Sequence, residues 1–112
     1  MVAKAKSPKI KETDLFPPVR DYLEKNGYTV RSEVRNCDIV AVKDSDVIVV
    51  ELKTGMNVSL LIQATDRQRI TDSVYVAIPD PPGRKGAHWR GIKRVLRQLE
   101  LGLILVTFSP RR

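Results

Sequence analysis

The sequence predicts a single α/β domain in which helices cover both faces of a central mixed sheet. Three observations lead to this prediction. A length of 112 residues suits one hydrophobic core, because such cores usually fall between about 50 and 200 residues. Hydrophobic residues make up 42% of the chain and charged residues 29%, a balance that excludes wholesale disorder. Runs rich in β-branched residues also alternate with amphipathic stretches of helical period.

The first helix is predicted over residues 12–26. Its apolar residues recur at helical spacing, and an Asn-Gly pair supplies the stop. These apolar residues are Val19, Tyr22 and Leu23. Because Pro17 and Pro18 are tolerated only in a first helical turn, we expect the helix to start or kink near Phe16.

Three strands are predicted next, over residues 28–34, 37–42 and 47–53. The second and third are apolar on both faces, which is typical of strands in the middle of a sheet that helices cover on each side. Residues 43–46 are expected to form the loop of an antiparallel hairpin between them.

A second helix is predicted from an Asn57 cap to about Thr71. Its inward residues are Leu60, Leu61 and Ala64, and its outward residues are Asp66, Arg67 and Arg69. The next strand covers residues 73–78, and a right-handed crossover would make it parallel to the strand before the helix.

The chain is predicted to end with a further helix and strand. The apolar face of this last helix consists of Trp89, Ile92, Val95, Leu96 and Leu99. Gly102 is expected to end the helix, and residues 103–108 form the closing strand. The complete predicted order is αβββαβαβ.

Charge is distributed unevenly along the chain. Residues 1–11 contain four lysines and no acid, so they are predicted to be a basic flexible tail ahead of a domain at 12–112. Residues 12–80 contain eight bases and twelve acids, whereas residues 81–112 contain eight bases and one acid. This distribution favours a polyanion as the partner, although such charge serves solubility alone in many small basic proteins.

The candidate phosphate contacts are basic residues on the first strand, in the loop after it and on the last helix. They are Arg31, Arg35, Arg90, Lys93, Arg94 and Arg97. Any amphipathic helix has a charged face, but the face of the last helix carries nearly a single sign. This single sign favours nucleic-acid binding over simple solvation.

Nothing in the sequence indicates a membrane or secreted protein. The longest apolar runs, residues 47–50 and 103–106, are far shorter than the roughly 20 residues that span a bilayer. The N-terminus lacks the apolar segment of a secretory signal. Cys37 is the single cysteine and is predicted to be a small buried residue, which fits a reducing compartment. We therefore expect a cytoplasmic protein.

The predicted hairpin brings charged residues together at one end of the sheet. With the loop at residues 43–46, counting back along the antiparallel pair places Asp38 opposite Glu51. Lys53 projects from the same face as Glu51, because strand side chains alternate. We therefore expect Asp38, Glu51 and Lys53 to converge.

Two such carboxylates need a compensating charge. At about 5 Å they repel by roughly 3 kcal/mol at an effective dielectric of about 20, so either one is protonated or a cation lies between them. If Lys53 is that cation, the group is an ordinary ion cluster at a strand end. The functional alternative is Mg²⁺, for which the two carboxylates and the backbone carbonyl of Leu52 form a hard-oxygen set with open positions.

These residues resemble the motif of the PD-(D/E)XK phosphodiesterase and nuclease superfamily. Cys37-Asp38 stands for its first element, with Cys in place of Pro, and Glu51-Leu52-Lys53 stands for its second. The resemblance covers residues 12–78 and implies the αβββαβ core of a restriction-endonuclease-like fold. The chain is also similar in size and order to small archaeal Holliday-junction resolvases, and more closely similar to bacterial phosphodiesterases of this superfamily without assigned substrates.

The resemblance implies metal-assisted hydrolysis of a phosphodiester. Asp38 and Glu51 would ligate Mg²⁺, for which Mn²⁺ substitutes, and Lys53 would orient or help to deprotonate the attacking water. Gln63, on the helix after the motif, would position the water or the phosphate.

Glutamates of the first helix also enter the expected site. In families of this kind a Glu at the start of the first helix often joins the metal site, and Glu12 matches that place. Glu24 is a poorer candidate. The alternative for Glu12 is a solvated carboxylate that the helix dipole favours.

Two hypotheses of function follow. The first is a Mg²⁺-dependent nuclease acting on DNA, including structured or branched DNA, and a homodimer would let it cut two strands. The second is a catalytically inactive nucleic-acid-binding module of the same fold. Retention of both carboxylates and the lysine favours the enzyme, and an RNA-directed nuclease is a third alternative.

Overall fold

The computed structural model describes residues 9–33, 38–83 and 85–108. Three helices and five strands follow one another in the predicted order. They are α1 (Glu12–Lys25), β1 (Thr29–Glu33), β2 (Asp38–Lys43), β3 (Asp46–Leu52), α2 (Val58–Arg67), β4 (Ser73–Pro79), α3 (Ala87–Gln98) and β5 (Gly102–Val106). Within the described part of the chain, no helix has the length and apolar character needed to cross a membrane.

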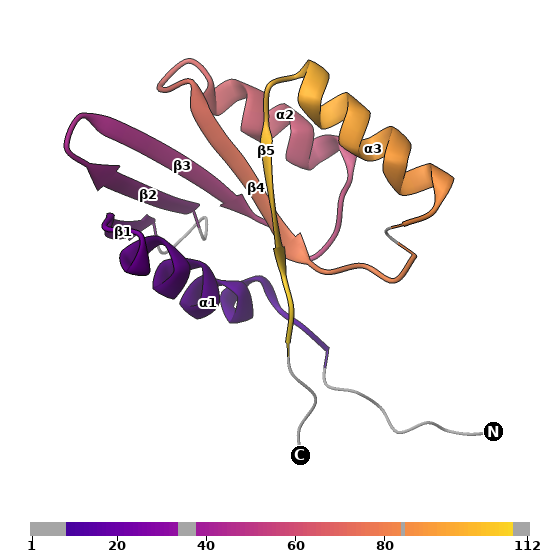
Figure 1. Ribbon diagram of the computed structural model, residues 1–112, viewed down its shortest axis with the longest axis horizontal. Coiled ribbons are helices and arrows are strands. Elements are labelled where there is room, and N and C mark those ends of the chain that lie inside the picture. The colour runs from indigo at the N-terminus through magenta and orange to yellow at the C-terminus, as the bar shows by residue number, and fades with distance from the viewer. Residues whose placement is uncertain (1–8, 34–37, 84, 109–112) are drawn as a thin grey trace.

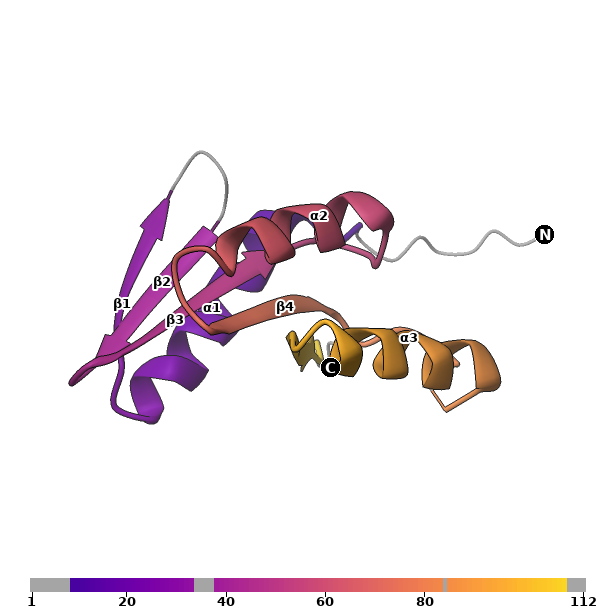
Figure 2. The same cartoon turned by 90° about the horizontal axis from the view of Figure 1, so that it is seen from above.

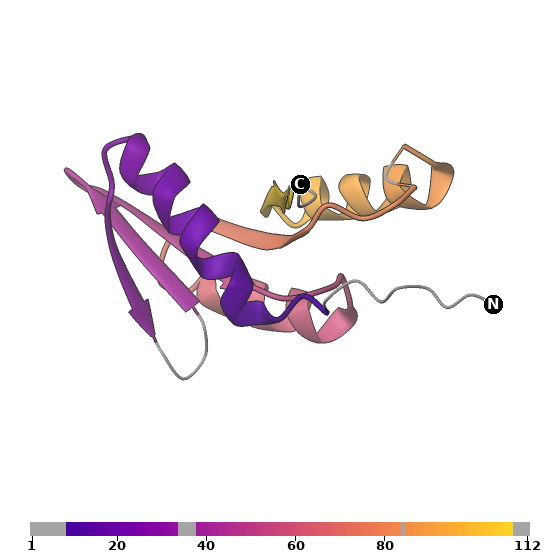
Figure 3. The ribbon, with the colours of Figure 1, turned by 90° about the horizontal axis from the view of Figure 1, so that it is seen from below.

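The strands form one mixed sheet in the order β1-β2-β3-β4-β5 (Figure 1). The pairs β1/β2 and β2/β3 are antiparallel, and the pairs β3/β4 and β4/β5 are parallel. The predicted parallel pairing across the second helix is therefore confirmed. Figure 2 shows α2 and α3 in front of the sheet, and Figure 3 shows α1 running across the opposite face.

Two hydrophobic cores lie on the two faces of the sheet. The core under α1 contains Leu15, Val19, Leu23, Ile39, Ala41, Ile48, Val50, Leu52, Ala77 and Val106. The core under α2 and α3 contains Val49, Leu60, Ala64, Val74, Val76, Ile78, Leu96 and Leu101. Strand β3 contributes to both, which confirms the prediction that it lies in the middle of the sheet and is covered on each side.

The prediction that α1 starts near Phe16, one of the two alternatives, is wrong. The helix starts at Glu12, so Pro17 and Pro18 lie in its second turn and not its first. Interior prolines cost a helix about 3 kcal/mol or more each, because they remove a hydrogen bond and crowd the preceding turn. Burial of the apolar stripe against the sheet offsets this cost, and Asp14 Oδ2 accepts a 2.9 Å bond from the backbone N–H of Lys11 at the helix start.

The hairpin between β2 and β3 has the predicted register and a shorter turn. Val42 is the partner of Val47, as expected. Lys43 and Asp46 also pair, so the loop is reduced to two residues. The first of them, Asp44, has a φ of 55°, the left-handed conformation that tight hairpins require.

Two predicted helix ends are wrong. Helix α2 stops at Arg67 and not near Thr71, whose hydroxyl instead donates a 2.8 Å hydrogen bond to the carbonyl of Val47. Helix α3 stops at Gln98, and the left-handed residue after it is Glu100, with a φ of 61°. Gly102 is the first residue of β5 and does not end the helix.

Candidate active site

Glu51 is the only charged residue that is buried in the described part of the chain, with 3% of its surface exposed. Along β3, Val50 and Leu52 belong to the core under α1, and Val49 belongs to the core under α2. Alternation therefore directs Glu51 towards α2. Burying a carboxylate is costly unless a partner compensates its charge.

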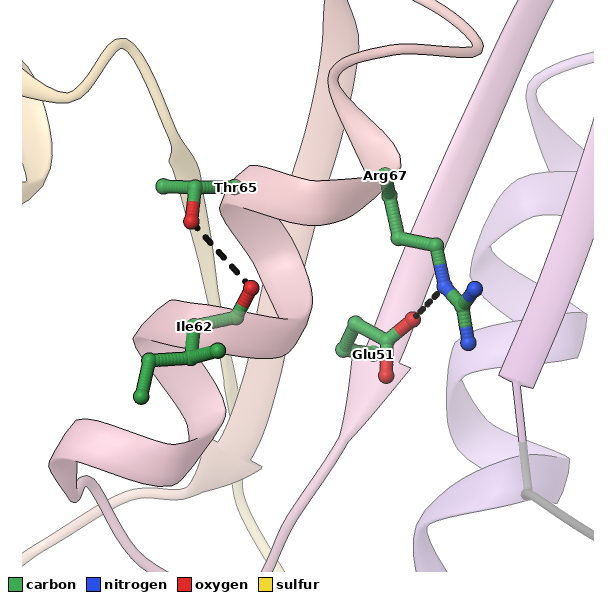
Figure 4. Close-up of polar contacts among 4 residues, drawn as sticks. All are labelled: Glu51, Ile62, Thr65 and Arg67. Carbon is green, nitrogen blue, oxygen red and sulfur yellow. Dashed lines mark hydrogen bonds and ion pairs between the residues drawn. The ribbon is translucent and has the colours of Figure 1, made fainter.

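Arg67 is that partner. Its Nε donates a 2.7 Å hydrogen bond to Glu51 Oε2, which is also an ion pair (Figure 4). The prediction that Arg67 points outward is wrong. Arg67 follows Leu60 and Ala64 at helical spacing, so it lies on the same stripe of α2 that covers the sheet. That spacing, together with the need of a buried carboxylate for a cation, is a signal that could have identified it from the sequence.

Lys53 forms a second ion pair, with the start of α1. Its Nζ lies 3.6 Å from Glu12 Oε2, and each side chain is about one third exposed. Its backbone N–H donates to the carbonyl of Ala77, which extends the ladder between β3 and β4 by one bond. Among the ion pairs of the described residues, Lys53 pairs with Glu12 and not with Glu51.

Asp38 is placed by its backbone alone. It is the first residue of β2 and the register partner of Glu33 on β1. The register of β2 and β3 runs as far as Ile39 opposite Val50. One further step places Asp38 across from Glu51, as the hairpin predicts. The side chain of Asp38 lies outside the described residues, as do Arg35 and Cys37.

Gln63 lies one helical turn before Arg67 on α2 and, among the described residues, has no recorded contact with these charges. It is exposed on α2 and lines a shallow depression together with Thr65, Asp66 and Arg69. None of the hydrogen bonds recorded for the described residues joins Gln63 to Glu51 or Lys53. Figure 4 shows Thr65, bonded to the carbonyl of Ile62, on the side of α2 away from Glu51.

The basic side chains predicted to bind nucleic acid are on the outside of the fold. Arg31 is exposed on β1, the edge strand. On α3, Arg90, Arg94 and Arg97 are exposed and Lys93 is half-buried. The opposite face of this helix packs on the core under α2 through Trp89, Ile92, Leu96 and Leu99. Helix α3 is therefore amphipathic as predicted, with a polar face made of cations.

The donors near the end of β3 are all oxygens. In residues 9–33, 38–83 and 85–108, no group of three or more His, Cys, Asp or Glu side chains is close enough to hold a metal ion. Glu51 nevertheless accepts a cationic group at 2.7 Å, so its position suits a positive charge. Carboxylates and a backbone carbonyl are the ligands that a hard cation such as Mg²⁺ prefers, so the chemistry of the donors fits this ion.

Comparisons of the chain with protein-family models, with curated proteins and with solved structures find no match. The structure itself establishes an α/β domain with a five-stranded mixed sheet and three helices among the described residues. A function for the chain therefore has to be argued from the ion pairs at the end of β3 and from the charge of α3.

Proposed function

We propose that the chain is a metal-dependent nuclease that hydrolyses phosphodiester bonds in DNA, including structured or branched DNA. The observation that carries this proposal is the buried carboxylate of Glu51 near the end of β3, followed two residues later by Lys53. A buried charge stabilises a fold weakly at best, and its retention in a sheet interior is more typical of a functional site.

A restriction-endonuclease-like fold is part of the same proposal. Its support is the order αβββαβ over residues 12–79 and the mixed sheet in which β1, β3, β4 and β5 run in one direction and β2 runs in the other. The resemblance of Cys37-Asp38 and Glu51-Leu52-Lys53 to the PD-(D/E)XK motif supplies the assignment of roles.

In this proposal, Asp38, Glu51 and the carbonyl of Leu52 would hold Mg²⁺, and Glu12 would join them. A divalent ion bound there polarises a phosphate and makes water more acidic. Lys53 would orient the attacking water and stabilise negative charge that develops on the phosphate. Gln63, one helical turn before Arg67 on α2, would position the water or the phosphate.

The cationic face of α3 supports nucleic acid as the partner. Arg90, Arg94 and Arg97 are exposed, and none of them is recorded in an ion pair with a described carboxylate. Guanidinium groups bind phosphate oxygens through two hydrogen bonds at once, so this face suits a DNA backbone. A cytoplasmic location stays a prediction, for which the single cysteine is the support.

The decisive experiment is a cleavage assay with matched variants. The purified protein is incubated with linear, nicked, flap and four-way-junction DNA in Mg²⁺, in Mn²⁺ and in EDTA. We expect cleavage that requires the metal and is abolished in Glu51→Gln. Glu24→Gln is the control, because Glu24, the poorer candidate for the metal site, is exposed in the last turn of α1, about 18 Å along the helix from Glu12. Equal cleavage by wild type and Glu51→Gln would exclude this active site.

A non-catalytic nucleic-acid-binding module is the second candidate. The ion pair between Glu51 and Arg67 favours it, because the acid already has a cation. The pairing of Lys53 with Glu12 favours it as well. Binding of the DNA panel without cleavage in either metal would support this function. An RNA panel in the same assay tests the RNA-directed nuclease, and sedimentation of the free and DNA-bound protein tests the expected homodimer.

A further inference from the structure

Resting on the proposed nuclease function, we infer that Arg67 competes with the divalent cation for Glu51 and contacts a phosphate of the substrate once the cation has taken its place. Arg67 belongs to no part of the motif that suggested the function. Arg67 thereby adds a residue of α2 to the site, with Glu51 among its partners before metal binding and a phosphate contact afterwards.

Arg67 contacts a carboxylate oxygen of Glu51 that a metal ion would need. Its Nε lies 2.7 Å from Glu51 Oε2, in direct contact with an oxygen that a metal ion would use. A carboxylate oxygen that ligates a cation at about 2.1 Å is poorly placed to keep a short hydrogen bond to a second cation. Metal binding at Glu51 and the present position of Arg67 therefore oppose each other.

Arg67 and Glu51 differ in burial. The side chain of Glu51 is 4% exposed, whereas that of Arg67 is 29% exposed. The carboxylate is thus fixed inside the domain, and the guanidinium lies at the boundary with solvent. Figure 4 shows the two terminal nitrogens of Arg67 on the side away from the Glu51 contact. Of the two partners, the guanidinium is therefore the more accessible from solvent.

The side chain of Arg67 also suits a phosphate partner. Arginine carries five donors in a planar fork that matches a phosphate, and it keeps its charge in every environment. Its long side chain can exchange one anionic partner for another without movement of the helix. Lysine could also compensate a buried carboxylate, but it lacks this planar fork.

The competition can be measured without any nucleic acid. Mn²⁺ is titrated into the protein and its binding followed by electron paramagnetic resonance or calorimetry, with Mg²⁺ as a second probe. In Arg67→Met we expect the metal to bind about three- to fivefold more tightly, a factor that corresponds to loss of an ion pair of modest strength. Arg69→Met is the matched control, because Arg69 lies two residues away, pairs with Asp66 and is 84% exposed. Its metal affinity should equal that of wild type.

The phosphate contact is measured on the same variants. At saturating Mn²⁺, Arg67→Met should cleave DNA at least about tenfold more slowly than wild type, since one charged group at a phosphate contributes that much or more. Arg69→Met should cleave normally. Arg67→Lys retains a charge but loses the fork, so we expect metal affinity close to wild type together with slower cleavage. If Arg67→Met does not fold, Arg67→Gln, which also removes the charge, carries the metal titration, and Arg67→Lys carries the cleavage test.

The outcomes separate this inference from the proposed function. Metal affinity that is unchanged or weaker in Arg67→Met, or normal cleavage by Arg67→Lys, would overturn the role of Arg67 while leaving the nuclease intact. If wild type cleaves no nucleic acid, the nuclease proposal fails, and the titration still decides whether Arg67 and a metal compete for Glu51. Absence of metal binding in both proteins would overturn the competition.

Discussion

Tyr75 on β4 and Gly102 on β5 are register partners, and the tyrosine ring lies where a side chain at position 102 would have to go. A β-carbon added to Gly102 would come within 2.3 Å of Tyr75 Cδ2. An aromatic side chain that covers a strand glycine fills the space that the missing side chain leaves. The glycine at the start of β5 is therefore required by its neighbour and not by its own backbone.

Gly102→Ala is expected to destabilise the domain by about 1–3 kcal/mol, because the added methyl group forces the ring or the strand to move. The free energy of unfolding in urea measures this change. Gly55→Ala is the control, since nothing lies within 4 Å of a β-carbon at Gly55. A loss of stability in Gly55→Ala as large as that in Gly102→Ala would contradict the explanation.

The ion pair between Glu51 and Arg67 gives a prediction of stability. Glu51→Met alone is expected to cost about 1–3 kcal/mol, because it leaves the partly buried Arg67 without this acid. The double variant Glu51→Met with Arg67→Met should recover most of that loss, since an apolar pair needs no compensation in a sheet interior. Urea unfolding of the four proteins of the cycle measures the coupling. Additive losses would mean that the two side chains do not depend on each other.

We expect replacement of Lys53 to affect the rate of DNA cleavage more than the free energy of unfolding. Its ion pair with Glu12 is 3.6 Å long and partly exposed, so Lys53→Met is expected to change the free energy of unfolding by less than about 1 kcal/mol. Cleavage of DNA should fall by about a hundredfold or more, because the cation that stabilises the phosphate is lost. Single-turnover kinetics measures the effect, with Lys25→Met, an exposed lysine of α1, as the control. A drop in both proteins would argue against a specific role.

We expect the charged face of α3 to make the affinity for DNA depend on salt concentration. If Arg94 and Arg97 each contact one phosphate, replacing either by alanine should reduce the slope of log affinity against log salt by about 0.9. Arg20→Ala is the control, because Arg20 lies on α1 and pairs with Asp21. Fluorescence anisotropy with duplex DNA between low and moderate salt measures the slopes. Unchanged slopes in both α3 variants would place the DNA elsewhere on the protein.

Local patterns were sufficient to predict the order of the elements and the register of the central hairpin. Apolar residues on both faces of β3 specify a covered strand, and a period of two leaves few ways to pair it with β2. Capping by Asn57 was predictable for the same reason, since Oδ1 accepts a 2.8 Å bond from the N–H of Leu60 only three residues away. These features depend on neighbours in the sequence.

The features that the sequence did not reveal depend on how elements cross in space. Arg67 faces inward because α2 lies over β3 at Glu51, and a helical pattern alone does not give that crossing. Pro17 and Pro18 lie inside α1 because burial against the sheet outweighs their local cost. Glu100 adopts the left-handed conformation in the turn after α3, whereas Gly102 lies in β5 against the ring of Tyr75.

Helix α1 contacts all five strands and is the only described helix on its face of the sheet. The same helix begins with Glu12, whose carboxylate holds Lys53, and buries Leu15 less than one turn later. Movement of α1 along its axis would displace Lys53 and weaken the packing of the helix on all five strands. In the proposed nuclease, the position of Lys53 and the stability of the sheet would therefore depend on the same helix.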